Sequence, residues 1–477
     1  MQVGIISGIY ADTTPELRTS YPVNLMPVPS SSGISSGYLR PGDGIVSNGT
    51  GPGPTRGGIN WLGNLYRVMG SQLVQINSAG LISSLGNVGG VDDPVTFDYS
   101  FDELAVASAG NIFFWNGTVL TQGVYPLVTI GSIIDFCFID GRYMITDGDR
   151  LFVTDIGNPL VIGAFAFEEP IADPDPISAV IRLRNEVYAI NRHTMEVYDN
   201  TTANVPFPFS VIDGAQIQKG CLGTHACCVY MDSIAFVGGG RNEAPGVYVG
   251  AAARTQKIST NEIDSILAEY PESRLANIVC EARNDKNHQH LYVHIPNIEF
   301  GDTSGRTLVY DATASQALQQ SVWFTLTSTL EGFEEYRARH LVWVYDNWYV
   351  GDPQSGLIGY LVQDVGSHWG AKVRWEFGTA IAYAGGKGAL MQQLELVSLT
   401  GSVVIGTEPQ ISTSYSVNGL SYSQERFISV GTYGSNKRLS WFQQGNLQNW
   451  RLQRFRGDSD AHITYVRLEA QVETLKY

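Results

Sequence analysis

The stretch Tyr143-Met-Ile-Thr-Asp-Gly-Asp-Arg-Leu-Phe-Val-Thr154 contains two short apolar segments separated by a polar turn with a glycine. Short apolar runs bounded by Asp and Gly are typical of β-strands joined in a hairpin. Glycine and proline together supply 72 of the 477 residues, which suits many short strands and tight turns better than long helices. The stretch therefore predicts a β-hairpin, and the repetition of this hairpin along the chain decides the fold.

Seven units of this kind follow one another. Their first strands begin at Leu65, Leu104, Tyr143, Val187, Ile234, Leu291 and Trp348, which are 39, 39, 44, 47, 57 and 57 residues apart. Their second strands begin at Leu73, Ile112, Leu151, Met195, Val247, Leu308 and Leu357. One hairpin in each 40–50 residues is what a β-propeller requires, because a single blade cannot bury both of its faces. We expect an all-β protein with a seven-bladed β-propeller over residues 59–388. Unrelated hairpins in one or two sandwiches are the alternative, which the near-regular spacing disfavours.

The segments that flank the repeat have a different character. Residues 1–58 are rich in Pro, Gly and Ser, and we expect an extended N-terminal arm that gains order by packing on something else. Residues 389–477 alternate apolar and polar positions in longer strands and predict a C-terminal β-sandwich. A short helical insertion is predicted near 259–270, where Ser259 and Glu262 have capping-box spacing and precede an apolar face.

Composition excludes several classes of protein. No apolar run approaches the ~18 residues of a membrane helix, and the first residues lack the basic and apolar stretches of a secretory signal. Five cysteines, two of them adjacent, do not form a disulfide framework, so we expect a soluble protein that folds in a reducing cytoplasm. The net charge of −16 argues against a surface that grips nucleic acid, but it suits a wall past which DNA slides.

Four segments carry a resemblance to a known family. They are Tyr21-Pro-Val-Asn-Leu25 with Ser35 to Gly44, Gln218-Lys-Gly220 through Val237, Lys257 to Tyr270, and Thr307-Leu-Val-Tyr-Asp-Ala312 leading to Trp323. In these segments, and in its order of arm, propeller and sandwich, the chain resembles the tail hub proteins of short-tailed phages. These are also called packaged DNA stabilisation proteins or tail accessory factors.

The resemblance implies a structural virion protein of the phage tail, assembled in the host cytoplasm, and not an enzyme. It implies a homo-oligomer, a hexameric ring below the portal and its adaptor protein. That ring extends and closes the DNA exit channel, retains packaged DNA during head completion, and carries the tail needle and tailspikes until genome ejection. No membrane partner is implied.

The best candidate for a metal site is His288-Gln-His290-Leu-Tyr-Val-His294. Residues of equal parity share one face of a strand, so the three imidazoles could converge on a zinc ion. No nearby Cys, Asp or Glu completes the set, so a polar edge of one blade is the favoured interpretation. We therefore predict no metal and no cofactor.

A local reversal of charge lies near the C-terminus. Between residues 426 and 456 there are basic residues and no acidic ones; they are Arg426, Lys437, Arg438, Arg451, Arg454 and Arg456. Docking against an acidic neighbouring subunit is the first interpretation, and contact with exiting DNA is the second. Arginines that simply face water are the third.

A propeller-type polysaccharide hydrolase or lyase, or a sugar-binding protein, is the alternative function, because Trp and Tyr are abundant. Four carboxylates lie close together, at Glu168, Glu169, Asp173 and Asp175, but prolines interleave them. An extended, solvated loop does not separate the pKa values of two carboxyl groups as glycosidase catalysis requires.

Overall fold

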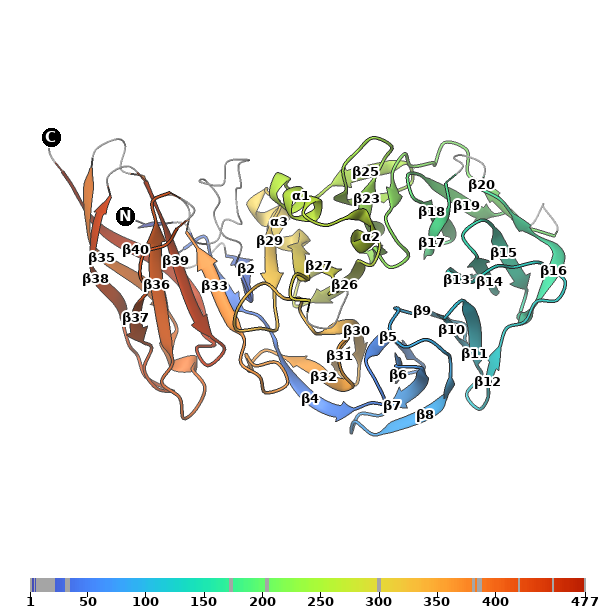
Figure 1. Cartoon of the computed structure of the whole chain (residues 1–477), viewed down its shortest axis with the longest axis horizontal. Coiled ribbons are helices and arrows are strands. Elements are labelled where there is room, and N and C mark those ends of the chain that lie inside the picture. The colour runs from blue at the N-terminus through green and yellow to red at the C-terminus, as the bar shows by residue number, and fades with distance from the viewer. Residues whose placement is uncertain are drawn as a thin grey trace.

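The computed structural model describes residues 2–3, 5, 22–30, 35–170, 175–201, 206–297, 302–379, 382–383, 388–418, 421–447 and 450–475. They form a ring of antiparallel sheets with a sandwich beside it (Figure 1). The predicted all-β architecture of propeller and sandwich is confirmed. No helix in these ranges is long and apolar enough to span a membrane.

The ring consists of seven sheets, which we number in chain order. The first three contain β5 (Thr55–Trp61), β6 (Asn64–Met69), β7 (Gln72–Ile76) and β8 (Ile82–Asn87); β9 (Thr96–Tyr99), β10 (Leu104–Ser108), β11 (Asn111–Trp115) and β12 (Leu120–Gln122); and β13 (Asp135–Ile139), β14 (Arg142–Thr146), β15 (Leu151–Asp155) and β16 (Asn158–Glu168). The fourth contains β17 (Ile177–Leu183), β18 (Glu186–Asn191), β19 (Met195–Asn200) and β20 (Phe209–Val211).

The fifth sheet contains β21 (Gly220–Cys221), β22 (Cys227–Tyr230), β23 (Ser233–Gly239), β24 (Gly246–Ala251) and β25 (Arg254–Lys257). The sixth contains β26 (Val279–Asp285), β27 (His288–Ile295), β28 (Arg306–Asp311) and β29 (Trp323–Leu326). The seventh contains β30 (Arg339–Val344), β31 (Asn347–Gly351), β32 (Leu357–Val362) and β4 (Gly44–Thr50). Each of the seven predicted hairpins therefore lies in the middle of its own sheet.

The ring closes without a covalent link. The innermost strands of successive sheets contact one another, and β30 of the seventh sheet contacts β5 of the first. The outermost strand of the seventh sheet is β4, which comes from the N-terminal side and pairs with β32 (Figure 1). The predicted boundary at residue 58 is therefore wrong, because residues 44–58 belong to the propeller and not to an arm.

Two-residue turns fix the register of the hairpins. Asp140-Gly141 and Lys286-Asn287 join the first and second strands of their sheets, and all four residues have φ between 48° and 77°. Turns with two positive φ angles match the right-handed twist of the flanking strands. Asp, Asn and Gly adopt that conformation at the least cost. These turns precede the predicted hairpins, which join the second and third strands of each sheet.

Neighbouring sheets pack through apolar faces. Phe114 of the second sheet contacts Tyr143 of the third, with ring centroids 5.2 Å apart, in a cluster that spans both sheets. Helices α1 (Asn261–Ala268) and α2 (Glu272–Leu275) connect the fifth sheet to the sixth, and α3 (Ala312–Leu318) lies between β28 and β29. The predicted helix corresponds to α1, but its N-cap is Thr260, whose side chain accepts the N–H of Ile263.

The sandwich combines both ends of the chain. One sheet contains β2 (Leu25–Pro29), β3 (Gly37–Pro41), β40 (Tyr465–Thr474), β35 (Ala389–Ser398) and β38 (Leu439–Leu447), with β1 (Gln2–Val3) beside β40. The other contains β33 (Arg374–Gly378), β39 (Trp450–Asp458), β36 (Gln410–Ser416) and β37 (Arg426–Ser429), with β34 (Ala382–Tyr383) beside β39; η2 (Thr400–Ser402) follows β35. The sandwich therefore begins at residue 374 and not at 389, and it includes part of the predicted arm.

The N-terminal segment, described over residues 22–30 and 35–50, runs between the propeller and the sandwich (Figure 1). Val23 exchanges two backbone hydrogen bonds with Glu376 of β33, and Asn24 donates its N–H to Thr325 of β29. The buried amide of Asn24 donates to the carbonyls of Thr327 and Arg374, at 2.9 and 2.7 Å, and accepts the N–H of Thr327 at 3.0 Å. One side chain thus joins the propeller to the sandwich. Tyr21, the first residue of the quoted segment, lies outside the described residues.

We predict that Asn24→Ala destabilises the chain by about 2–4 kcal/mol, because it leaves buried backbone groups of both bodies without partners. Asn24 has φ 53°, which alanine adopts less readily, so Asn24→Gly serves as the matched control for backbone strain. Denaturant unfolding should show that both variants lose most of this stability. Full stability of Asn24→Gly would contradict the role given to the side chain.

Candidate functional site

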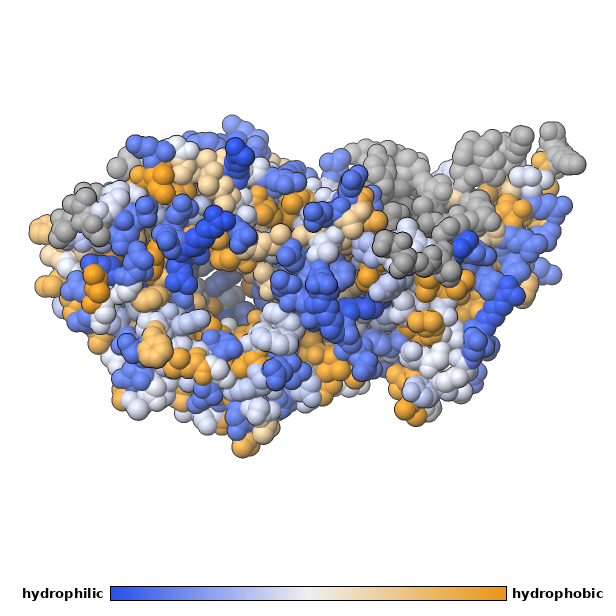
Figure 2. Space-filling model, turned by 180° about the vertical axis from the view of Figure 1, so that it is seen from behind, coloured by the Kyte–Doolittle hydropathy of each residue, from blue (hydrophilic) through white to orange (hydrophobic). Residues whose placement is uncertain are grey.

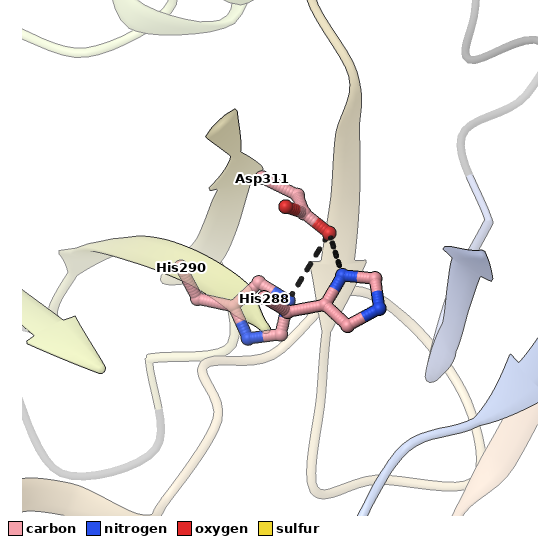
Figure 3. Close-up of side chains that lie close together, drawn as sticks. All are labelled: His288, His290 and Asp311. Atoms are coloured by element: carbon pink, nitrogen blue, oxygen red, sulfur yellow. Dashed lines mark hydrogen bonds and ion pairs between the residues drawn. The ribbon is translucent and has the colours of Figure 1, made fainter. Parts of the chain in front are cut away.

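Two histidines and an aspartate converge at one end of the sixth sheet. The Nδ1 atom of His288 lies 2.6 Å from Oδ2 of Asp311, and Nε2 of His290 lies 3.4 Å from the same oxygen (Figure 3). His288 and His290 begin β27, whereas Asp311 ends the adjacent strand β28. One potential ligand atom from each residue lies within 4.8 Å of the other two. The two imidazoles and the carboxylate can share a proton, or they can bind a cation.

Burial and charge set the protonation of this cluster. Burial alone would raise the pKa of Asp311, but the hydrogen bonds from His288 and His290 lower it below its ordinary value overall. Burial lowers the pKa of His290, and Asp311 only partly offsets that effect. Asp311 also caps α3 by accepting the N–H of Ala314 at 3.1 Å. The carboxylate is therefore held in place by two elements.

The third predicted histidine does not join the cluster. His294 lies four residues further along β27, which is about 13 Å at the rise of a strand. Its ring stacks on Tyr292, and its Nδ1 atom is 3.1 Å from the hydroxyl of Thr307. Equal parity placed all three side chains on one face, but only a residue of the next strand completes the group. Sequence reasoning missed Asp311 for that reason.

The basic residues of the C-terminal segment occupy different environments. Arg451 is buried, with its guanidinium 3.8 Å from the centre of the Tyr415 ring and 2.5 Å from the carbonyl of Gln444. Its predicted role in an interface or DNA contact is therefore wrong, because a side chain enclosed in the sandwich cannot reach a partner. Burial also lowers its pKa to about 10.

Three of the other arginines are paired with acids from outside the segment. Arg456 lies 2.5 Å from Glu376 and 3.3 Å from Glu425, and Arg454 lies 3.7 Å from Glu425. Both arginines project from one face of β39, because they are two residues apart. Arg438 binds Glu395 of β35 at 2.5 Å. Acidic side chains from outside residues 426–456 therefore neutralise much of the positive charge of this segment in the folded chain.

Arg426 and Lys437 are the exposed remainder of the predicted set. Arg426 donates to the carbonyl of Gln443 at 3.0 Å, and Lys437 lies in the connection between β37 and β38. These two side chains and the paired Arg438 are the most exposed basic groups of the segment, and the side chain of Arg456 is 37% exposed. They do not form the continuous basic groove that tracks single-stranded nucleic acid.

A cavity of about 300 Å³ lies where the innermost strands meet. Figure 2 shows a hollow through the propeller, seen from behind. Both carboxylate oxygens of Glu281, which lines the cavity, accept backbone N–H groups, from His340 and Leu341 at 2.8 Å each. Burial raises the pKa of Cys280, so this thiol stays protonated. These groups join neighbouring sheets and are poorly placed for acid–base or nucleophilic chemistry.

Buried carboxyl groups elsewhere on the innermost strands have the same structural role. Asp135 of β13 accepts the hydroxyl of Thr96 in the second sheet at 2.6 Å and the N–H of Val180 in the fourth at 2.8 Å. Asp98 of β9 accepts the N–H of Phe138 in the third sheet. One carboxyl group can therefore connect three consecutive sheets.

The acidic loop considered for a hydrolase is only partly described. Glu169 forms an ion pair with Arg150 at 2.8 Å, and Asp175 accepts the N–H of His193 at 2.6 Å. Asp173 lies outside the described residues. Glu169 and Asp175 are thus engaged in separate local contacts.

One face of the ring carries apolar side chains at its hairpin tips. In each antiparallel sheet, counted from its innermost strand outward, the turn between strands one and two and the turn between strands three and four lie at the same end. Large apolar side chains that are more than half exposed occupy six of these turns; they are Leu62, Leu81, Phe101, Val119, Ile156 and Met231. Exposed apolar groups at these turns suit protein contacts. Val91, Val124 and Leu127 are also more than half exposed, in connections between sheets at the opposite end.

Comparison with known proteins gives matches along both bodies. The family model described as Bacteriophage P22 Gp10, beta-propeller, matches residues 1–366, and the model described as Bacteriophage P22 Gp10, beta-sandwich, matches residues 374–473. The chain is 26% identical over 443 residues to the tail hub protein gp10 of Salmonella phage P22, covering 90% of this chain and 89% of that protein.

Two solved structures share only a general likeness. PorZ, a bacterial surface component of the type-IX secretion system of Porphyromonas gingivalis, is 11% identical with a TM-score of 0.38, covering 66% of this chain and 38% of that one. The computationally designed Ika8 protein is 12% identical with a TM-score of 0.37, covering 67% of this chain and all of that one.

We predict that Asp135 makes stability depend on pH. Burial raises the pKa of Asp135 from 3.8 to about 7, so between these values the folded chain keeps a proton that the unfolded chain has released. The contribution of Asp135 to the free energy of unfolding should therefore fall as pH rises from 4 to 7. Denaturant unfolding should show that the free energy of unfolding of Asp135→Asn, relative to that of the wild-type chain, increases over this pH range, whereas that of the exposed control Asp149→Asn keeps the wild-type slope. Equal slopes in all three proteins would contradict the assignment.

Proposed function

The chain belongs to the bacteriophage P22 Gp10 family, and from that premise we propose that it is the tail hub of a short-tailed phage, a structural component of the virion tail. The observation that carries the proposal is that the family match runs through both the propeller and the sandwich. The relative named as a tail hub protein also matches over nine-tenths of the chain. A shared propeller alone would leave function open, since one fold serves many functions.

The architecture suits a rigid structural subunit. The N-terminal segment is hydrogen-bonded to both bodies, so the ring and the sandwich are expected to move together. Buried polar side chains connect neighbouring sheets around the innermost strands, as Asp135 does. A rigid subunit keeps its contact surfaces in fixed positions, which assembly into a closed oligomer requires.

The finer features of the role are part of this proposal and rest on the resemblance to the family. We propose that six copies form a ring below the portal and its adaptor protein, extending and closing the DNA exit channel. The ring would retain packaged DNA and carry the tail needle and tailspikes, and it would assemble in the host cytoplasm. The apolar hairpin tips and the exposed basic residues of the sandwich are the surfaces that we assign to protein neighbours. Net acidity would limit adhesion of DNA to the channel.

The enzymatic and sugar-binding alternatives have less support. The chain's family is structural, and the chain is not an enzyme. The described polar groups of the central cavity are engaged in contacts between sheets. A polysaccharide hydrolase or lyase would instead need carboxyl groups in contrasting environments that face a substrate.

We predict that a phage lacking this gene packages DNA and then loses it. Without the hub the exit channel stays open, so internal pressure would expel the genome. Encapsidated DNA should fall after packaging, as measured by nuclease protection in purified particles, and wild-type protein added to the lysate should prevent the loss. Particles that retain their genome normally would contradict the proposed role.

The exposed basic residues provide a second test. The double variant Arg426→Glu with Lys437→Glu should enter particles poorly, because charge reversal opposes docking to an acidic neighbour. Its DNA affinity across a salt series should equal that of the wild-type chain. The double variant Arg184→Glu with Arg254→Glu, at exposed basic residues of the propeller, is the control that has the same change in net charge. Normal incorporation with a loss of salt-dependent DNA binding would favour DNA contact instead.

A further inference from the structure

The cluster of His288, His290 and Asp311 contains a weakly paired buried group. His290 is 2% exposed, and its Nδ1 atom is buried without a hydrogen-bond partner. Its Nε2 atom points toward Asp311 at 3.4 Å, which is long for a hydrogen bond (Figure 3). A buried imidazole with so weak a contact costs free energy, and a ligand that binds Nε2 more strongly would stabilise it.

We propose that His288, His290 and Asp311 bind one divalent transition-metal ion of the zinc class. Imidazole nitrogens and a carboxylate oxygen are ligands that zinc prefers, and three protein ligands leave a fourth position for water. Zinc–ligand bonds of about 2.0–2.1 Å in a tetrahedron separate neighbouring ligand atoms by about 3.3 Å. The distance of 3.4 Å from His290 to Asp311 is close to that value, whereas His288 must move away from the carboxylate.

The surrounding charges favour a cation. Arg283, whose charge acts on His290, lies 2.7 Å from both Asp43 and Asp285. Asp43, Asp285 and Asp311, counted with Arg283 and with Arg40, which lies 3.7 Å from Asp43, carry a net charge of −1, so a cation does not enter a positively charged site. The side chain of His288 is 15% exposed, so the ion can enter and keep a water ligand.

The proposed ion would connect three elements. His288 and His290 belong to β27, and Asp311 ends β28 and caps α3. Helix α3 contacts β2 of the sandwich. The ion would therefore stabilise the sixth sheet beside the junction of the two bodies. This role is independent of the tail hub assignment, and either can fail without the other.

The test uses the full chain, purified with a tag that lacks histidine and then freed of metal by a chelator. Calorimetric titration with ZnCl₂ should give one ion per chain, and Co²⁺ should give the intense visible bands of tetrahedral coordination. His290→Gln should bind Zn²⁺ roughly tenfold or more weakly. Asp311→Asn should do the same, while its amide oxygen still caps α3. The matched control is His294→Gln, a buried histidine on the same strand face outside the cluster, which should bind like wild type.

Absence of stoichiometric Zn²⁺ binding by the wild-type chain would overturn the proposal. Equal loss of affinity in His290→Gln and His294→Gln would also overturn it, because binding would then follow general destabilisation. If His290→Gln fails to fold, the cobalt spectrum of the wild type and its change in Asp311→Asn decide the matter. An octahedral spectrum that the Asp311→Asn change does not alter would place the ion elsewhere.

Discussion

The fold depends on how the N-terminal segment is shared between the two bodies. The seventh sheet combines strands from both ends of the propeller sequence, because β4 comes from the N-terminal side and pairs with β32 as the outermost strand. Some twenty residues earlier, Val23 and Asn24 form backbone hydrogen bonds with β29 of the propeller and β33 of the sandwich. The same short segment thus closes the ring and joins it to the sandwich.

Local sequence predicted the parts of the fold that local interactions form. The seven hairpins were found because two short apolar strands flank a polar turn, such as Asp147-Gly148-Asp149-Arg150, in which Gly148 has φ 98°. The position of the N-terminal segment in the fold was not predictable in the same way. Asn24 binds Thr327 and Arg374, which lie 303 and 350 residues away, and no periodicity records a contact of that separation. Both errors in the domain boundaries have this cause.

The candidate sites show the same limit for side chains. Strand parity correctly placed His288 and His290 together, but Asp311 belongs to the neighbouring strand. The basic segment was judged by the charges within it, whereas the acids that neutralise Arg438 and Arg456 come from β35 and β33. Which strands pair with one another decides which partner each of these side chains contacts, and local sequence does not predict that pairing.

The central claim is that the N-terminal segment makes the propeller and the sandwich one cooperative body. Amide hydrogen exchange of the native chain tests it most directly, because it reports the stability of each hydrogen bond separately. The amides of Val23, Asn24, Thr325 and Glu376 should exchange as slowly as those of the buried strand β27. Exchange of these four amides at the rate of exposed turns, while β27 stays protected, would show that the two bodies are only loosely connected and would contradict the account.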